Sequence, residues 1–338
     1  MIIEMIKGAS AEEVSSVIQR VESFGMKVQM NLGTDKKVVA VLGNNTGQLP
    51  TDTFAVLPGV ESVIRIMKPY KLASREFSAE TTIVSVDGIE IGSDRIVVMA
   101  GPCAVESKEQ LIEAARAVKE AGANILRGGA FKPRTSPFSF QGLEKTGLEL
   151  LAEAKEKYQL PIITEVVDPR DVEMVAEYAD ILQVGSRNMQ NFALLTTIGK
   201  IRCPVVLKRG FSCTITEWLT AADYLLAEGN NQVILCERGI RTFEDSARFS
   251  LDICSIPVVK KFSHLPIIID PSHAAGHYSL VPAIAKAAIA AGADGILCEV
   301  HPNPVEAMVD GLQSLKPSKF IQLMGELKQV AKSVGRHI

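Results

Sequence analysis

The basic segment at residues 125–137 has the clearest capacity for chemistry in the chain. It reads ILRGGAFKPRTSP, so a short apolar run leads into a loop that carries Arg127, Lys132, Arg134 and two hydroxyl residues. Arginine presents a planar fork that matches phosphate oxygens, lysine adds a compact charge, and adjacent glycines let backbone N–H groups approach an anion. The segment therefore predicts a phosphate site, although by itself it would also fit a solvated basic loop.

Polar side chains end the other apolar runs of the chain in the same way. In chain order these residues are Cys103, Arg127, Glu165, Gln183 with Arg187, Lys208, Glu237 with Arg238, Asp270 with His273, and Glu299 with His301. Each one alone could cap a helix or pair with a neighbour. Because chance rarely puts a polar residue at the end of eight successive apolar strands, the set predicts one shared active site.

Cations form the larger chemical subset of this site. Its members are Arg127, Lys132, Arg134, Arg187, Lys208, Arg209 and Arg238. They are more than a neutral substrate needs, and they contrast with a formal net charge of −3 for the chain. The surplus indicates one or two highly anionic, phosphorylated substrates.

A second subset combines soft and hard metal ligands. Cys103, His273, Glu299 and Asp310 offer a thiolate, an imidazole and two carboxylates. This mixture suits a divalent transition ion such as Mn, Fe, Zn or Co better than Mg. The spacing alone does not decide the matter, because the four residues are scattered and Cys103 could be an ordinary turn cysteine.

A repeated strand-then-helix rhythm over residues 95–338 must position these groups. The expected strands cover residues 96–100, 124–127, 162–165, 181–184, 205–208, 233–236, 267–270 and 295–300. Amphipathic helices are expected over residues 108–121, 143–158, 168–179, 215–228 and 280–291. Eight such units predict an α/β fold, a (β/α)8 TIM barrel, whose active site lies at the C-terminal ends of the strands. A doubly wound open sheet is the weaker alternative, because no G-x-G-x-x-G follows the first strand.

The first 68 residues predict a separate small domain. Strands are expected over residues 2–6, 27–31, 38–42 and 61–67, and helices over residues 10–24 and 51–57. The order β-α-β-β-α-β predicts a ferredoxin-like α+β domain, which without His or Cys suggests regulation or assembly. Residues 69–94 are predicted to be a linker and a hairpin, with Asp87-Gly88 as the turn.

Composition narrows the class of protein further. A chain of 338 residues with 47% hydrophobic residues and a net charge of −3 gives no general reason to bind nucleic acid or an anionic membrane. We see no signal peptide or transmembrane span. The six cysteines show no C-x-x-C spacing, which favours a reducing, cytoplasmic location.

Several motifs together resemble a known enzyme family. They are GPCAVE at 101–106, LRGGAFKPRTS at 126–136, GSRN at 185–188, LKRG at 207–210, CERG at 236–239, DPSH at 270–273, and EVHP at 299–302 with Asp310-Gly311. From about residue 70 onward the chain resembles 3-deoxy-D-arabino-heptulosonate 7-phosphate (DAHP) synthase, and its N-terminal module resembles the subclass with a ferredoxin-like regulatory domain. The resemblance implies the first step of the shikimate pathway, in which phosphoenolpyruvate, erythrose 4-phosphate and water give DAHP and inorganic phosphate.

The same resemblance implies roles for individual residues. The implied metal ligands are Cys103, His273, Glu299 and Asp310, and the implied phosphoenolpyruvate-binding residues are Arg127, Lys132, Arg187, Lys208 and Arg238, with Asp270 also expected to contact substrate. The implied site for the phosphate of the aldose is Arg134, Thr135 and Ser136. Cys103 and His273 are expected to take part in catalysis through the metal, and Lys208 or Glu165 through proton transfer.

Three other functions are compatible with some of these residues. The first is 3-deoxy-D-manno-octulosonate 8-phosphate synthase, which uses arabinose 5-phosphate; its aldose loop resembles Ala-Asn-Arg-Thr-Ser where this chain has Lys-Pro-Arg-Thr-Ser, and it lacks the N-terminal module. The second is an aldolase that forms a Schiff base on Lys208. The third is a non-catalytic protein that binds an effector on the N-terminal domain.

The resemblance also implies regulation and assembly. We expect the domain of residues 1–68 to close over a barrel mouth, or to bridge subunits, when an aromatic amino acid, Phe or Tyr, binds, and so to reduce access to the active site. A homotetramer is common in the family, so we expect one here.

Overall fold

The computed structural model describes residues 1–32, 36–43, 46–65, 68–134 and 136–338. It contains two compact units. The first is Met1–Thr81 with Lys261–His264, and the second is Thr82–Lys260 with Leu265–Ile338.

The first unit is built on a four-stranded antiparallel sheet with the strand order β2-β3-β1-β4. In chain order its elements are β1 (Ile2–Met5), α1 (Ala11–Glu22), β2 (Lys27–Leu32), β3 (Lys37–Leu42), α2 (Asp52–Ala55) and β4 (Val60–Ile64). This confirms the predicted ferredoxin-like order. The strand expected over residues 61–67 ends earlier in the structure, and its positions 66 and 67 lie outside the described residues.

Helix α1 shows how local sequence sets the core of this unit. Ser10 accepts a hydrogen bond from the backbone of Glu13, whose side chain accepts one from the backbone of Ser10, so a capping box starts the helix. Val14, Val17 and Val21 then recur at helical spacing and are buried against the sheet.

Residues 69–81, predicted as part of a linker, belong to the first compact unit in the structure. Leu72 and Ala73 are buried, and Ser74 forms an antiparallel bridge with Ser263. The buried His264 ring contacts the Leu72 carbonyl oxygen through Nε2 at 2.7 Å. Packing against a segment distant in the sequence therefore holds these residues in place.

The second unit begins with a two-stranded hairpin of β5 (Val84–Val86) and β6 (Ile89–Ile91). Its turn is Asp87-Gly88, and both residues have positive φ, which is the geometry that a two-residue turn of this kind requires. The buried side chains of the hairpin pack against inward-facing residues of the following strands. The hairpin therefore adds to the core of the second unit.

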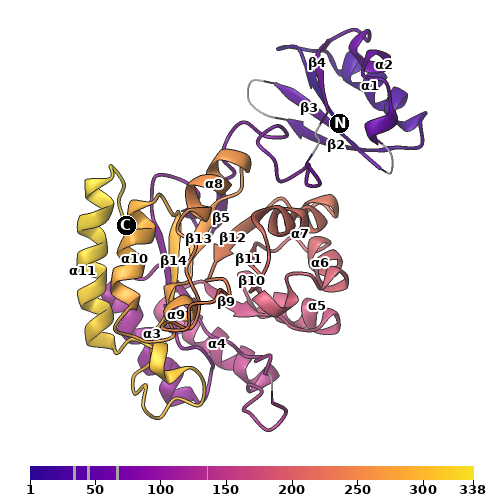
Figure 1. Ribbon diagram of the computed structural model, residues 1–338. Coiled ribbons are helices and arrows are strands. Elements are labelled where there is room, and N and C mark those ends of the chain that lie inside the picture. The colour runs from indigo at the N-terminus through magenta and orange to yellow at the C-terminus, as the bar shows by residue number, and fades with distance from the viewer. Residues whose placement is uncertain (33–35, 44–45, 66–67, 135) are drawn as a thin grey trace. The chain divides into compact units, whose positions relative to one another are not determined.

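Eight parallel strands then close into a barrel, as predicted, with helices around the outside (Figure 1). The strands are β7 (Val97–Gly101), β8 (Ile125–Arg127), β9 (Ile162–Glu165), β10 (Ile181–Val184), β11 (Val205–Lys208), β12 (Val233–Glu237), β13 (Ile267–Ile269) and β14 (Gly295–Glu299). The ring closes where β14 pairs with β7. Every strand is buried on both faces, as parallel barrel strands must be.

The helices between the strands follow the expected pattern with some differences. They are α3 (Lys108–Ala121), α4 (Glu144–Tyr158), α5 (Val172–Tyr178), α6 (Phe192–Gly199), α7 (Ile215–Ala227), α8 (Ser255–Phe262), α9 (Pro271–Ala275), α10 (Val281–Ala290) and α11 (Pro317–Ser333). The sequence analysis had not assigned α6, α8, α9 and α11. Helix α5 is shorter than predicted, because a 3-10 turn over Pro169–Asp171 precedes it.

Two further features concern the hydropathy of the helices and the state of the cysteines. None of the helices in the described parts of the chain is long and apolar enough to cross a membrane. All six cysteines are free thiols.

Candidate active site

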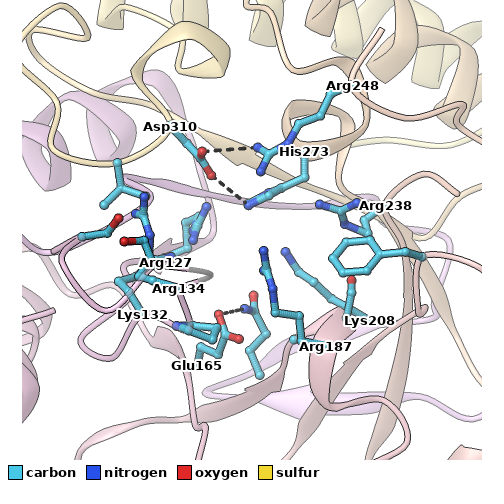
Figure 2. Close-up of a pocket in the computed structure, with 18 residues that line it drawn as sticks. Arg127, Lys132, Arg134, Glu165, Arg187, Lys208, Arg238, Arg248, His273 and Asp310 are labelled. Atoms are coloured by element: carbon cyan, nitrogen blue, oxygen red, sulfur yellow. Dashed lines mark hydrogen bonds and ion pairs between the residues drawn. The ribbon is translucent and has the colours of Figure 1, made fainter. Parts of the chain in front are cut away.

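A cavity of about 280 Å³ lies at the C-terminal ends of the barrel strands (Figure 2). Ten charged or titratable side chains on its wall are Arg127, Lys132, Arg134, Glu165, Arg187, Lys208, Arg238, Arg248, His273 and Asp310. Seven of these are Arg or Lys, so the cavity is strongly cationic in a chain of net negative charge. Such a cavity is suited to bind an anion with more than one negative group.

The structure brings together six of the seven cations that the sequence placed at this mouth. The exception is Arg209, which follows Lys208 directly but is not part of the cavity wall. Its guanidinium pairs with Glu237 at 2.8 Å and Asp252 at 2.9 Å. Successive side chains of a strand point to opposite faces, so Lys208 reaches the cavity and Arg209 does not.

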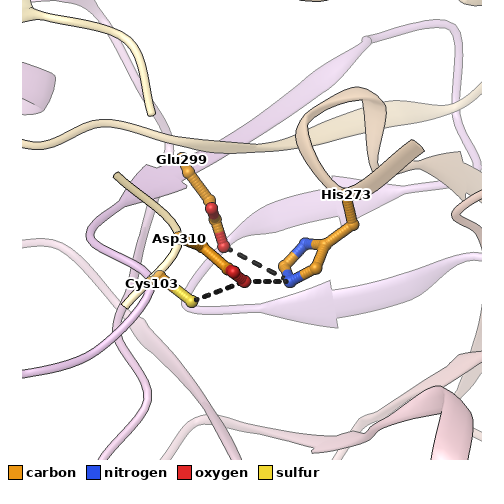
Figure 3. Close-up of side chains that lie close together, drawn as sticks. All are labelled: Cys103, His273, Glu299 and Asp310. Carbon is orange, nitrogen blue, oxygen red and sulfur yellow. Dashed lines mark hydrogen bonds and ion pairs between the residues drawn. The ribbon is translucent and has the colours of Figure 1, made fainter. Parts of the chain in front are cut away.

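Beside the cavity, four side chains converge from three strand ends and a loop (Figure 3). They are the predicted ligands Cys103, His273, Glu299 and Asp310, and one potential ligand atom from each lies within 4.8 Å of the others. Nε2 of His273 is 3.5 Å from Oε1 of Glu299 and 3.6 Å from Oδ2 of Asp310. Sγ of Cys103 is 3.6 Å from the same Asp310 oxygen.

The hydrogen bonding of His273 leaves its Nε2 atom available to a metal. Nδ1 donates to Oδ2 of Asp270 at 2.7 Å, because an ionised carboxylate can only accept. Burial lowers the pKa of His273 despite the neighbouring carboxylate, so the ring is neutral near pH 7 and its Nε2 carries a lone pair. A neutral imidazole oriented by a carboxylate is the usual arrangement of a metal-bound histidine.

Cys103 is buried next to cations that would balance its thiolate. Nζ of Lys132 lies 3.2 Å from the sulfur, and Arg127 pairs with the adjacent Glu299 carboxylate at 2.6 Å. Burial, followed by the charge of Glu299, raises the pKa of the Cys103 thiol to about 12. The residues present therefore fit a divalent ion, which would bind the thiolate in place of its proton.

Asp270 occupies a different position from the one predicted. The sequence analysis expected it to contact substrate, but it is fully buried and is not part of the cavity wall. One oxygen accepts from the backbone N–H of His273, and the other meets both His273 Nδ1 and, at 2.5 Å, Nζ of Lys208. Asp270 thus caps α9 and joins a ligand of the cluster to a lysine of the cavity.

Arg238 lies against a stacked pair of aromatic rings. Its guanidinium carbon lies 4.2 Å from the ring centroid of Phe249 and 4.8 Å from that of Phe211, and the two rings stack at 5.2 Å. Burial lowers the pKa of Arg238 to about 10, and its buried Nη1 atom has no hydrogen-bond partner among the described residues. A buried, positively charged hydrogen-bond donor without a partner is suited to bind an anionic ligand.

The loop after β8 adds further polar groups at the rim. Arg134 and Ser136 both line the cavity, and the buried Nη1 atom of Arg134 also lacks a partner in the described part of the chain. Thr135, which the sequence analysis assigned to the same site, lies outside the described residues.

Glu165, at the end of β9, supplies a carboxylate to the cavity wall. Gln183 donates to its Oε2 atom at 3.2 Å, and both side chains are buried. Gly185 lies close to this group, because a Cβ atom there would overlap the Glu165 carboxylate in its present position.

Two residues of this region were missed by the sequence analysis. Arg248 lies in the loop after β12, lines the cavity, and is 3.3 Å from Oδ1 of Asp310. Gln313 is buried and donates to Oε2 of Glu299 at 2.7 Å. Neither belongs to a motif or ends a strand, so no local signal marked them.

A closed (β/α)8 barrel with a thiolate, imidazole and carboxylate cluster beside a multiply cationic cavity defines a metal-dependent enzyme that acts on anionic substrates. Residues 76–336 match the family described as "DAHP synthetase I family", and residues 1–68 match the "DAHP synthase ferredoxin-like domain". The chain belongs to the DAHP synthetase I family.

Individual relatives support the assignment to this family. The chain is 47% identical over 335 residues to phospho-2-dehydro-3-deoxyheptonate aldolase of Thermotoga maritima. The aligned residues cover 99% of each of the two chains. A crystal structure of phospho-2-dehydro-3-deoxyheptonate aldolase (DAHP synthase) from Thermotoga maritima matches with a TM-score of 0.80 at 46% identity and covers 99% of this chain and 98% of that one. A truncated form of 3-deoxy-D-arabino-heptulosonate 7-phosphate synthase from the same organism matches with a TM-score of 0.75 at 46% identity and covers 80% of this chain and 99% of that one.

A more distant group of relatives carries a different name. The 2-dehydro-3-deoxyphosphooctonate aldolase of Francisella tularensis is 30% identical over 272 residues, which cover 74% of this chain and 98% of the relative. The higher identity and the coverage of both units therefore favour the DAHP synthases.

Proposed function

We propose that this protein catalyses the condensation of phosphoenolpyruvate with erythrose 4-phosphate and water to give DAHP and inorganic phosphate, the first step of the shikimate pathway. The observation that carries the proposal is that His273 and Asp310 belong both to the four-ligand cluster and to the wall of the cationic cavity. A metal-bound carbonyl and a bound phosphoanion would therefore be neighbours. Family membership supports the same reaction.

Phosphoenolpyruvate is the ligand we assign to five cations of the cavity wall. Arg127, Lys132, Arg187, Lys208 and Arg238 all line the cavity and together balance its phosphate and carboxylate charges. Fixing this substrate directs its C3 atom toward the C1 atom of the aldose. The encounter of two substrates then becomes nearly intramolecular.

The loop after β8 is our assignment for the phosphate of erythrose 4-phosphate. Arg134 and Ser136 lie on the cavity wall, and Arg134 offers an unpartnered donor. We keep Thr135 in this assignment as a prediction from the sequence.

Cys103, His273, Glu299 and Asp310 are our proposed ligands for a divalent ion, with Mn, Fe, Zn and Co as candidates. When bound, such an ion would supply a Lewis acid for the aldehyde oxygen of the aldose. Asp270 keeps the His273 ring in the metal-binding tautomer. We therefore propose Asp270 as a positioning residue rather than a substrate contact.

Proton transfer is assigned to two side chains of the cavity wall. The C2=C3 bond of phosphoenolpyruvate supplies the electron pair for a bond from C3 to C1 of the aldose, while the C1=O π bond breaks and its oxygen takes up a proton. Water adds at C2 and loses a proton, and the C2–O bond to phosphate then breaks, which leaves a ketone at C2 and releases inorganic phosphate. Lys208 or Glu165, acting through water, is our candidate for proton handling: the Glu165 carboxylate can accept the proton that leaves the attacking water, and the Lys208 ammonium can supply a proton to the aldose oxygen. Both line the cavity, and Glu165 is held by Gln183.

The alternative functions are less well supported. A Schiff-base aldolase needs a neutral Lys208, but Nζ of Lys208 lies 2.5 Å from the buried Asp270 carboxylate, which stabilises the charged ammonium. The octulosonate branch is supported only by relatives of lower identity that cover about three quarters of the chain, 74% for the relative from Francisella tularensis. A non-catalytic effector-binding protein would have no need of the complete ligand cluster.

The test is release of inorganic phosphate from phosphoenolpyruvate with erythrose 4-phosphate or arabinose 5-phosphate as co-substrate. We expect release with the four-carbon sugar alone. Release with the five-carbon sugar alone would assign the chain to the octulosonate branch. A reaction with borohydride that labels Lys208 and stops turnover would instead support the Schiff-base function.

We also propose that residues 1–68 are a regulatory domain that binds an aromatic amino acid, Phe or Tyr, and that residues 95–338 carry all catalytic residues. The match of residues 1–68 to the ferredoxin-like domain of this family supports the first part. A chain that lacks residues 1–70 should keep its activity and lose inhibition by the amino acid. Inhibition that persists in the shortened chain would contradict this proposal.

Assembly and location complete the proposal. We propose a cytoplasmic homotetramer, in keeping with the expectation from the family and with six free thiols. Light scattering on the purified chain tests the subunit number directly.

A further inference from the structure

Gln313 joins two of the proposed metal ligands from behind the cluster. It lies at the end of a short 3-10 helix, Gly311–Gln313, and is 2% exposed. Its Nε2 atom donates to Oε2 of Glu299 at 2.7 Å and to Oδ2 of Asp310 at 3.3 Å. One amide therefore spans the two carboxylates of the cluster.

The other end of the amide is fixed by Arg248. The guanidinium Nη1 atom of Arg248 donates to Oε1 of Gln313 at 2.6 Å. Guanidinium groups only donate and ionised carboxylates only accept, so the orientation of the amide is determined by its partners. Of the uncharged side chains, only an amide of this length satisfies all three contacts.

Arg248 also connects this arrangement to the cavity. It lies 3.3 Å from Oδ1 of Asp310, and Figure 2 shows it reaching toward Asp310 from the cavity wall. The approach requires glycine at position 276, because a Cβ atom there would overlap the side chain of Arg248. The glycine at position 276 therefore leaves room for the side chain of Arg248.

The backbone of Asp310 needs such support. It is not glycine, yet it adopts a left-handed conformation with φ 54° and ψ 34°. Non-glycine residues in this region are uncommon and persist where their surroundings hold them. Three contacts stabilise this conformation. The Asp310 carboxylate accepts from the Gln313 amide and pairs with Arg248, and the Asp310 carbonyl accepts a hydrogen bond from Ser314 Oγ.

We propose that Gln313 is a positioning residue, which sets the Glu299 and Asp310 carboxylates in the arrangement that receives the metal and is itself anchored by Arg248. The inference rests on the proposed function in one respect, namely that the cluster binds a metal. Hydrogen-bond partners of metal-ligating carboxylates typically change metal affinity by about 10- to 100-fold when they are removed. Gln313 is therefore expected to act on metal affinity more than on the folding of the barrel.

The first test measures metal affinity rather than activity. Co²⁺ is titrated into the metal-free protein, and the absorbance of a thiolate–Co²⁺ bond from Cys103 reports binding. Gln313→Met, which keeps the length of the side chain without the amide, should bind Co²⁺ about 10- to 100-fold more weakly. Gln322→Met, on the exposed face of α11, is the matched control and should bind as the natural protein does.

A second variant tests the amide N–H donor of Gln313 separately from the shape of the side chain. Gln313→Glu has the same shape and can accept from Arg248, but in its ionised form it cannot donate to the two carboxylates. We expect it to bind Co²⁺ at least about 10-fold more weakly. Affinity equal to that of the natural protein in either variant would overturn the inference.

The role of Arg248 is tested by a double-mutant cycle. If Arg248 acts by anchoring the amide, Arg248→Met and Gln313→Met combined should weaken Co²⁺ binding by less than the product of the two single losses. Losses that multiply fully would contradict the anchoring role.

The outcome also distinguishes this inference from the proposed function. A natural protein that shows no thiolate–Co²⁺ absorbance would contradict the metal site itself. A natural protein that shows it, together with an unchanged Gln313→Met, would contradict only the role of Gln313. Thermal unfolding of the metal-free variants identifies any that fail to fold, and Gln313→Asn then replaces such a variant.

Discussion

Asp270 and His273 form a buried pair in which Nδ1 of the imidazole lies 2.7 Å from Oδ2 of the carboxylate. The same oxygen meets Nζ of Lys208 at 2.5 Å. Burial opposes the charge on Asp270, but His273 and Lys208 outweigh it and keep the pKa of this carboxyl well below its ordinary value. One carboxylate therefore orients a proposed metal ligand and neutralises a lysine of the substrate cavity.

Replacement of Asp270 should disturb both of its partners. Asp270→Asn removes the charge that fixes the His273 tautomer, so metal affinity should fall by about 10- to 100-fold, as measured by Co²⁺ titration. The control is Asp168→Asn, at a side chain that pairs with the exposed Arg170 instead. Unchanged affinity in Asp270→Asn would mean that the carboxylate does not orient the histidine.

Metal affinity should rise with pH because of Cys103. The pKa of its buried thiol is raised to about 12, so the metal-free protein holds the proton at every pH between about 6 and 9. Binding to the thiolate releases that proton, and apparent affinity should therefore increase about tenfold for each pH unit in this range. Co²⁺ titrations at three pH values check the slope. A flat profile would exclude the Cys103 thiol as the group that gives up a proton.

The aromatic pair should matter for binding of phosphoenolpyruvate. Phe249→Leu removes one ring from Arg238, and cation–π contacts are worth about 0.5–2 kcal/mol, so the KM for phosphoenolpyruvate should rise about 2- to 30-fold. The KM for erythrose 4-phosphate should change less. Phe192→Leu, at a ring stacked on Tyr224, is the control. Equal increases in both KM values would argue against a role for this pair through Arg238.

The loop after β8 should set affinity for the aldose. A hydrogen bond from a charged group to phosphate contributes roughly 1.5–3 kcal/mol, so Arg134→Ala should raise the KM for erythrose 4-phosphate by about 10- to 150-fold. Initial rates with each substrate varied in turn test this. If the KM for phosphoenolpyruvate rose instead, the two phosphate sites would have to be exchanged.

The first unit should lose stability in mild acid through His264. Burial, with a smaller effect of Arg75, lowers the pKa of this ring from 6.5 to about 4. Between these values the unfolded chain binds a proton that the folded chain does not, so stability falls as the pH decreases from 6.5 toward 4, by up to about 3 kcal/mol. The side chain of His264→Gln cannot titrate, so the difference in unfolding free energy between the natural protein and this variant should shrink over that interval. A constant difference in urea unfolding would contradict the buried neutral ring.

The sequence was sufficient for the barrel because its signals are local. Apolar runs such as residues 181–184 and 205–208 coincide with β10 and β11, and helix α3 has the predicted bounds. The residues at the strand ends then meet because the fold brings all C-terminal strand ends to one face. Residue type and strand position therefore predicted most of the charged side chains on the cavity wall.

The parts that could not be predicted depend on distant contacts. Arg248 and Gln313 meet across 65 residues through two loops whose paths no periodic pattern encodes. For Asp270, the sequence located the strand end but not the orientation of the side chain, which turns back to cap α9. Arg209 adjoins Lys208 in the same motif, yet it pairs with Glu237 and Asp252 instead of lining the cavity.

The most direct test of the whole account is phosphate release from phosphoenolpyruvate and erythrose 4-phosphate before and after treatment with EDTA, with Mn²⁺ then added back. The account predicts that turnover is lost to EDTA and restored by Mn²⁺ in the natural protein, and that Cys103→Ser shows little recovery at the same Mn²⁺ concentration. Full turnover in the presence of EDTA would contradict a metal at Cys103, His273, Glu299 and Asp310, and with it the proposed activation of the aldehyde.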